Sequence, residues 1–403
     1  MLKHSPPIPQ NEMERLLELS DLDIDYTDLN ENFKDLTMLA AKIAGTEISL
    51  VNLIDAYTQW TISNHGIDLQ QMDRTDSVCQ YTLMEDDHFE VADLARDGRF
   101  NDKFYVQKPI ALRYYFGVPL KSSEGTNIGA LCVLDTNLKT LNPEKQEMLK
   151  IIADEIVNRI KTYKTLNSLR NEIKESSEAK RKVAHDIRGP LAGIIGLSEI
   201  ISQQGDDNKL EEVMEFVNLI HKSSKSILEL ADEILTDDKG GRKLTDAEYN
   251  LLVFKDKLHK LYDPQAIYKK IKLLVNVNPG TERIPFSKNK LLQITGNLIS
   301  NAIKFTPEGG TIKVDLDLIV QRDDKNLLSI QVSDNGVGLT QDAIDEIIEK
   351  KGVTTNGTSG EKGYGFGLAL VIHLIEGLKG SIEVASLPEQ GATFKIILPQ
   401  EKG

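Results

Sequence analysis

Residues 297–307 read NLISNAIKFTP, and this stretch decides how the C-terminal part of the chain is interpreted. Asn297, Asn301 and Lys304 are separated by four and three residues, so a helix would place their side chains on one face. Two carboxamides and one ammonium group on one stripe can hold a divalent cation and a phosphate tail. Paired asparagines on a helix more often face water, so this motif needs support from its neighbours.

Three further motifs follow along the chain. Residues 334–338 read DNGVG after an apolar strand, where a carboxylate can accept a hydrogen bond from an exocyclic amine and glycines let the backbone approach a flat base. Residues 360–368 read GEKGYGFGL and lead into a helix, whose first amides favour phosphate. Residues 391–393, GAT, add a hydroxyl. The candidate residues are Asp334, Gly336, Gly338, Gly363, Gly365, Gly367 and Thr393.

Other nucleotide-binding motifs are excluded. The chain contains no G-x-x-x-x-G-K-[ST] pattern, which excludes a P-loop. The glycine run near Gly363 follows a polar loop and not a strand, which argues against a Rossmann turn. Each motif is weak alone, so their order and spacing carry the prediction.

His185 stands apart from the other histidines because it lies in VAHDIRGPL, residues 183–191. A neutral imidazole is a competent nucleophile when one ring nitrogen is oriented by an acceptor and the other keeps its lone pair. Asp186 can supply that acceptor. A His-Asp pair on a helix usually just faces water, so the pattern alone leaves both a surface position and a catalytic role open.

Together these residues resemble the sensor histidine kinases of two-component systems over about 166–399. His185 to Leu191 is similar to the phosphoacceptor box, and the later motifs are similar to the nucleotide boxes of Bergerat-type ATPases. The resemblance implies that His185 accepts a phosphoryl group from ATP with Asp186 orienting the ring, and that a separate response regulator receives it on an aspartate. It implies the following nucleotide contacts: Asn301 on Mg²⁺ with help from Asn297, Lys304 on phosphate, Phe305 over the base, Asp334 on the adenine amine and Thr393 supporting it.

The middle of the chain predicts a helical hairpin. Asn142-Pro143-Glu144 opens a helix with no Gly or Pro before Gly189, and an imperfect heptad pattern beginning at Leu149 indicates a coiled coil. Residues 205–208 break the pattern, and a second amphipathic helix follows over 210–235. We expect an antiparallel hairpin that forms a four-helix bundle in a homodimer.

The N-terminal part shows strand-like runs at 48–54, 60–63, 115–120 and 128–134, with a turn at 122–125 that predicts an antiparallel hairpin. Residues 93–100, 114–120 and 128–135 resemble GAF sensor domains, which implies an antiparallel sheet flanked by helices and an unidentified small ligand. Neither Cys79 nor Cys132 lies in a bilin-attachment motif, so no covalent bilin is expected. We expect both cysteines to be packing residues.

Composition narrows the function further. The 403 residues carry 48 Lys and Arg against 62 Asp and Glu, and a net charge of −14 argues against nucleic-acid partners. No apolar run reaches membrane-spanning length and residues 1–10 lack signal-peptide character, which predicts a cytoplasmic protein. The fold expected is multidomain α+β. Its parts are a disordered lead-in at 1–10, a GAF sensor at 11–163, a coiled-coil linker and hairpin at 164–238, and a Bergerat-type α/β sandwich ATPase domain at 244–403.

Two alternatives stay open at this stage. One is a catalytically silent scaffold that binds ATP only to change shape, and the other is a different Bergerat-type kinase or ATPase. Gly189 stands where many relatives carry the Thr or Asn associated with phosphatase activity, so that activity is left open. The sequence also leaves the signal, the identity of the response regulator, and cis or trans phosphorylation undecided.

Overall fold

The computed structural model describes residues 7–26, 29–204, 213–222, 224–225, 228, 249–286, 290–321, 325–348 and 366–401. The chain forms two compact units. The first comprises Met1–Thr165 and Asp246–Gly403, and the second comprises Leu166–Thr245. No helix among these residues combines the length and apolar character needed to cross a bilayer.

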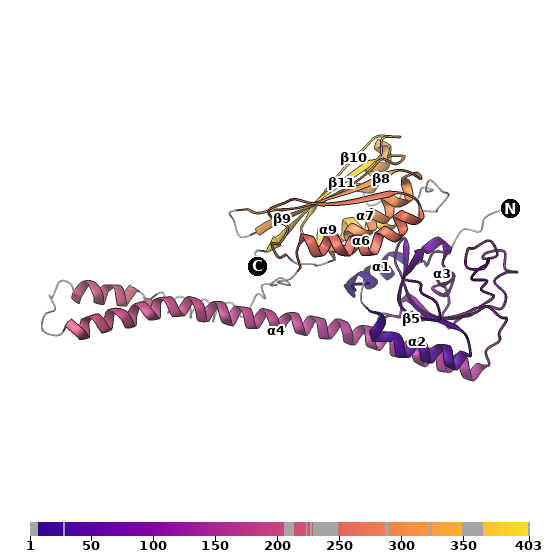
Figure 1. Ribbon diagram of the computed structural model, residues 1–403, viewed down its shortest axis with the longest axis horizontal. Coiled ribbons are helices and arrows are strands. Elements are labelled where there is room, and N and C mark those ends of the chain that lie inside the picture. Colours follow the sequence, from indigo (N-terminus) through magenta and orange to yellow (C-terminus); the bar gives the residue numbers. More distant parts are fainter. Residues whose placement is uncertain are drawn as a thin grey trace. The chain divides into compact units, whose positions relative to one another are not determined.

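The N-terminal part of the first unit is built on a six-stranded antiparallel sheet with the order β3-β2-β1-β6-β5-β4 (Figure 1). The four predicted strands are present, and β5 and β6 form the predicted antiparallel hairpin. β3 and β4 were not predicted, because three residues are too few to show an alternating pattern. The elements are α1 (Glu12–Asp21), α2 (Asn30–Ala44), β1 (Ile48–Ile54), β2 (Thr58–His65), β3 (Gln71–Asp73), η1 (Arg74–Asp76), α3 (Cys79–Thr82), β4 (Phe89–Val91), β5 (Tyr114–Lys121) and β6 (Asn127–Asp135).

Both faces of this sheet are covered. Helix α2 and the start of α4 (Pro143–Gln204) bury one face, and α3 with residues 89–112 buries the other. Strand β1 is therefore buried at every residue, which explains its nearly continuous apolar sequence. Cys79 and Cys132 are free thiols buried in the second of these cores.

Helix α4 begins where Asn142-Pro143-Glu144 predicted, with the Asn142 Oδ1 atom accepting a hydrogen bond from the Lys145 amide at 2.9 Å. The first apolar positions of the expected heptad pattern, Leu149, Ile152 and Ile156, pack in the N-terminal core. Over this stretch the periodicity therefore reflects core packing and not a coiled-coil seam.

The second unit contains the rest of α4 and a further helical stretch over 213–222. That stretch agrees with the predicted second hairpin helix. The expected turn at 205–208 and the boundary at 236–243 lie outside the described residues. Several apolar side chains in this unit are exposed: Leu191, Ile195, Met214, Val217 and Leu228.

The C-terminal part of the first unit is a five-stranded sheet with the order β10-β11-β9-β8-β7. Only the β7–β8 pair is parallel. Helices α6, α7 and α9 cover one face (Figure 1). The elements are α6 (Leu251–Tyr268), β7 (Lys272–Val277), α7 (Leu291–Phe305), β8 (Thr311–Ile319), β9 (Lys325–Asp334), α8 (Gln341–Ile348), α9 (Phe366–Gly377), β10 (Ser381–Ser386) and β11 (Ala392–Glu401). This mixed α+β content agrees with the predicted fold class.

Candidate functional site

Helix α7 carries the first predicted site residues. Asn297, Asn301 and Lys304 are all buried, with exposed fractions of 4%, 8% and 7%. The Asn297 Nδ2 group donates to the carbonyl oxygen of Gln293 at 2.9 Å. The buried face of α7 therefore carries three polar side chains, which are stable there only with polar partners.

Asp334 ends strand β9 and is half-buried. Its Oδ1 atom accepts hydrogen bonds from the amides of Gly336 at 2.8 Å and Ala392 at 3.3 Å. Within the described residues no group donates to Oδ2. Burial raises the pKa of Asp334, and the two amide hydrogen bonds offset that rise only in part.

The glycines after Asp334 are required by close backbone contacts. A Cβ atom on Gly336 would lie 2.3 Å from the carbonyl oxygen of Phe305. Gly338 has φ +67°, and a Cβ atom there would lie 2.0 Å from the carbonyl oxygen of Leu387. The Val337 amide also donates to the Phe305 oxygen at 3.2 Å. The DNGVG loop is thereby fixed against the end of α7.

Phe305 and Thr393 flank this loop. Phe305 is half-buried, and the Lys304 Nζ atom lies 5.0 Å from its ring centroid. Thr393 lies opposite Ser333 across the β11–β9 pair and its hydroxyl donates to the Ser333 hydroxyl at 3.0 Å. Thr393 also follows Ala392, whose amide binds Asp334. These contacts bring Phe305, Asp334 and Thr393 to one end of the sheet.

The remaining predicted residues are only partly described. Gly367 lies buried in the first turn of α9, whereas Gly363 and Gly365 lie outside the described residues. His185 and Asp186 lie within α4 in the second unit, and their side chains are outside the described part of the structure.

Sequence reasoning missed Tyr57, in the turn between β1 and β2. Its hydroxyl donates to the Asn301 Oδ1 atom at 3.4 Å, and the Lys304 Nζ atom lies 6.0 Å from its ring centroid. Burial raises the pKa of Tyr57, and the charge of Asp55 adds to that effect. No local signal could have found this contact, because 244 residues separate the partners.

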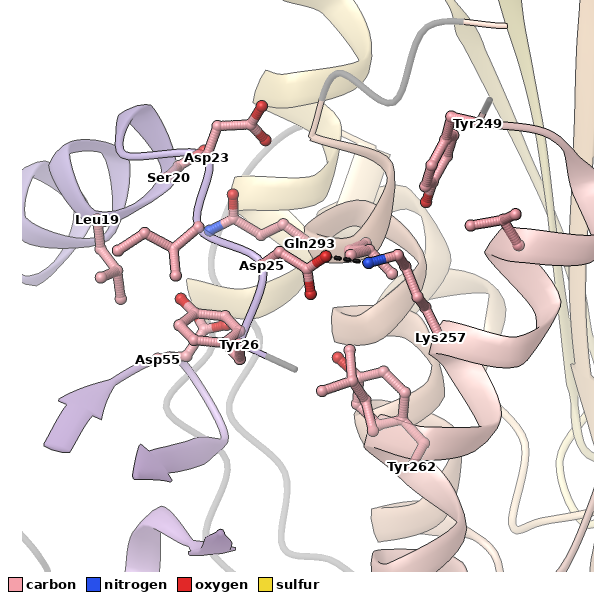
Figure 2. Close-up of a pocket in the computed structure, with 14 residues that line it drawn as sticks. Leu19, Ser20, Asp23, Asp25, Tyr26, Asp55, Tyr249, Lys257, Tyr262 and Gln293 are labelled. Carbon is pink, nitrogen blue, oxygen red and sulfur yellow. Dashed lines mark hydrogen bonds and ion pairs between the residues drawn. The ribbon is translucent and has the colours of Figure 1, made fainter. Parts of the chain in front are cut away.

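A cavity of about 300 Å³ lies between the α1–α2 connection and α6 (Figure 2). Asp25 points toward Lys257 and forms an ion pair with it. Tyr26, Asp55 and Tyr262 line the same space. Burial raises the pKa of Asp55. A hydrogen bond from the Ala56 amide to its carboxylate offsets part of that rise.

Two family profiles match separate segments of the chain. Residues 177–242 match the "His Kinase A (phospho-acceptor) domain". Residues 287–402 match the family described as "Histidine kinase-, DNA gyrase B-, and HSP90-like ATPase". The chain therefore contains one segment similar to each of these families, in the order predicted from the motifs around His185 and Asn301.

Two curated proteins are similar to parts of the chain. The Autoinducer 2 sensor kinase/phosphatase LuxQ of Vibrio parahaemolyticus is 30% identical over 257 residues, covering 61% of this chain and 29% of its own length. The Cyclic di-GMP phosphodiesterase PA2567 of Pseudomonas aeruginosa is 34% identical over 164 residues, covering 40% of this chain and 28% of its own length. The chain spans less than a third of the length of these curated relatives.

Among solved structures, the histidine kinase AdeS of Acinetobacter baumannii is 18% identical, with a TM-score of 0.29. The match covers 54% of this chain and 98% of that chain.

Proposed function

We propose that this protein is a sensor histidine kinase that transfers the γ-phosphoryl group of ATP to His185 and then to an aspartate of a separate response regulator. The observation that carries the proposal is the pair of family segments in one chain, with a histidine box in the first and a buried polar face on α7 in the second. The names of the relatives, which include a sensor kinase/phosphatase, support it.

The adenine end of the nucleotide would bind at Asp334. Its Oδ2 atom can accept a hydrogen bond from the exocyclic amine while the Gly336 and Ala392 amides hold the carboxylate in place. Thr393 supports this end of β9, and Phe305 would contact the face of the base. Gly336 lets the DNGVG loop lie against the carbonyl oxygen of Phe305, which holds Asp334 close to the end of α7.

The phosphate end would bind along α7. The Asn301 amide oxygen suits Mg²⁺ bound to the triphosphate, with Asn297 assisting, and Lys304 offers a cation to the phosphate oxygens. Gly363 and Gly365 precede α9 in the sequence and Gly367 lies in its first turn, whose amides would face phosphate. A protein of net charge −14 would thus hold a triphosphate through local groups.

The transfer itself would need little covalent chemistry from the ATPase segment. The His185 ring nitrogen donates its lone pair to the γ-phosphorus, the bond from that phosphorus to the bridging oxygen breaks, and ADP leaves. Asp186 would orient the ring and stabilise the proton on its other nitrogen. Positioning and charge neutralisation supply most of the rate enhancement.

Exposed apolar side chains in the second unit support a homodimer. Leu191, Ile195, Met214 and Val217 are each about half exposed, and a four-helix bundle between two copies would bury such residues. The N-terminal sheet with helices on both faces supports assignment of a GAF-type sensor domain. The response regulator would then dock on the bundle near His185.

Labelling with ATP carrying a radioactive γ-phosphate tests the proposal. We expect acid-labile label on the wild type and at least a hundredfold loss in His185→Gln, because the nucleophile is removed. His221→Gln is the matched control, since His221 lies in an exposed helical position of the second unit. Acid-stable label, or undiminished labelling of His185→Gln, would contradict the proposal. Nucleotide binding without any label would favour the silent-scaffold alternative.

A further inference from the structure

The β1–β2 turn of the N-terminal sheet reaches the site described on α7. The Tyr57 hydroxyl binds the Asn301 Oδ1 atom, and its ring lies 6.0 Å from the Lys304 Nζ atom. A Cβ atom placed on Gly367 would lie 2.2 Å from Cε2 of this ring. One side chain therefore contacts three residues that the proposed function gives to Mg²⁺ and phosphate.

We propose that this turn is an autoinhibitory plug: in the docked arrangement Tyr57 fills the phosphate end of the nucleotide site and must leave before Mg·ATP can bind. The inference rests on the proposed function, because it assigns Asn301, Lys304 and Gly367 to the nucleotide. It adds the regulation of that same site by the N-terminal domain.

The turn is held firmly in the shape that presents Tyr57. Arg15 donates to the Ile54 carbonyl oxygen at 2.5 Å, and the Arg74 side chain donates to the Asp55 oxygen at 3.2 Å. The Arg74 amide donates to the Tyr57 carbonyl oxygen at 2.9 Å. Glu12 binds both guanidinium groups, and all three charged side chains are at most 1% exposed. A plug that is ordered before docking loses little conformational entropy on insertion.

A wider contact around the plug holds the two domains together. Trp60 stacks on Tyr26 at 5.0 Å and meets the Tyr262 ring edge-on at 5.8 Å. The Gln265 Nε2 group donates to Gln71 Oε1 at 2.6 Å, and Gln71 donates to the Leu261 carbonyl oxygen at 2.8 Å. An aromatic centre with a polar rim is the usual composition of a specific interface.

Ion pairs lie at the edge of the same contact. Lys257 pairs with Asp25 (Figure 2), and Lys290 pairs with Asp21 at 2.6 Å. Each partner is partly exposed, so these pairs steer docking more than they strengthen it. An interface of this kind can open when a signal changes the N-terminal domain.

The expected size of the effect follows from competition. If about nine tenths of the molecules are docked, the apparent affinity for nucleotide falls about tenfold. Removing the plug should restore it. Removing only the Tyr57 hydroxyl should not, because the ring still fills the space.

The test measures binding of Mg²⁺ with a non-hydrolysable ATP analogue by the full chain, together with autophosphorylation rate. We expect Tyr57→Ala to bind about tenfold more tightly and to label faster, whereas Tyr57→Phe should stay within about threefold of the wild type. Tyr268→Ala, at a tyrosine that is 83% exposed, is the matched control and should change neither quantity. The double variant Gln71→Ala, Gln265→Ala removes docking contacts that lie away from the nucleotide site. Like Tyr57→Ala, it should raise both the affinity for the analogue and the rate of autophosphorylation.

Trp60 supplies an independent readout, because it is the single tryptophan and is 3% exposed. Its emission should shift to longer wavelength when the analogue saturates the wild type. Unchanged affinity and rate in Tyr57→Ala and in the double glutamine variant, with the analogue still bound by the wild type, would overturn the plug while leaving the kinase proposal intact. Absence of analogue binding in every variant would instead overturn both.

Discussion

At the scale of single residues, Asp334 is the group through which we expect nucleotide affinity to depend on pH. In the proposed complex its ionised form would accept a hydrogen bond from the adenine amine, and burial holds the pKa of this carboxyl above its ordinary value. Protonation during acidification therefore begins at a higher pH than for an exposed aspartate, whose pKa is about 4.

We expect the affinity for an adenine nucleotide to fall as pH is lowered through this raised pKa. Asp334→Asn should weaken binding about tenfold to a hundredfold at pH 7 by removing a charged acceptor worth roughly 1.5–3 kcal/mol. The measurement is titration with the non-hydrolysable analogue between pH 5 and 8, for which Asp315→Asn on the neighbouring strand β8 is the control. An Asp334→Asn variant with the same pH dependence as the wild type would contradict this role.

Glu12 is a second residue whose charge affects a measurable property, here the stability of the fold. Burial raises its pKa, but hydrogen bonds and charges from Arg15 and Arg74 outweigh that effect, and the pKa of Glu12 is lowered overall. A lowered pKa means that the carboxylate stabilises the fold above its unfolded pKa, and that this contribution is lost as the pH falls through the folded value.

Glu12→Gln should therefore lower the free energy of unfolding by about 3 kcal/mol at pH 7, because it leaves two buried guanidinium groups without their anion. The difference from the wild type should shrink below about pH 4. Urea unfolding followed by Trp60 emission measures it. Glu31→Gln removes an exposed partner of Lys34 and should leave the midpoint nearly unchanged. A pH-independent difference would show that packing and not charge is responsible.

The sequence predicted some residues of the site and missed others for a physical reason. Asn297, Asn301 and Lys304 share a helix, so their spacing alone placed them together. Tyr57 reaches Asn301 only through tertiary packing, and Glu12 meets Arg74 across 62 residues. A local pattern carries no information about such partners.

At the scale of elements, helix α4 runs without a break from the N-terminal core into the second unit. Leu166, Leu169 and Ile173 are exposed along it, which leaves an apolar stripe available for a partner helix. A continuous helix transmits rotation, since each added residue turns everything beyond it by about 100°.

We therefore expect one alanine inserted after Arg170 to change basal autophosphorylation severalfold, because it rotates the His185 box relative to the N-terminal domain. Insertion of a full heptad should restore a rate near that of the wild type, since it returns the stripe to nearly the same face. The labelling assay measures both variants. Equal rates for the single and heptad insertions would show that α4 does not couple the two parts.

Element prediction succeeded where the periodicity was strong. Strand β8 alternates, with Ile312, Val314, Leu316 and Leu318 buried, and the apolar strand predicted before DNGVG is β9. Helix α6 was missed because Pro264 lies inside it, and an interior proline ordinarily argues against a helix. The helix persists because its buried residues pack against α7 and β7.

At the scale of the whole molecule, the N-terminal sheet and the C-terminal sheet belong to one compact unit, and a single apolar cluster includes Leu16, Ala56 and Trp60 with residues of α6. Composition and motifs predicted a succession of domains along the chain. They could not predict that the β1–β2 turn would contact helix α7, because that contact depends on surface complementarity between distant segments.

The two cysteines have a practical consequence for following the motions of this protein. Both Sγ atoms lie 3.8 Å apart inside the core between α3 and β6, and Asn52 donates a hydrogen bond to each. As the chain contains no other cysteine, a thiol reagent can label it only when this core opens. The labelling rate thus measures how often this N-terminal core opens, and a ligand bound there would lower that rate.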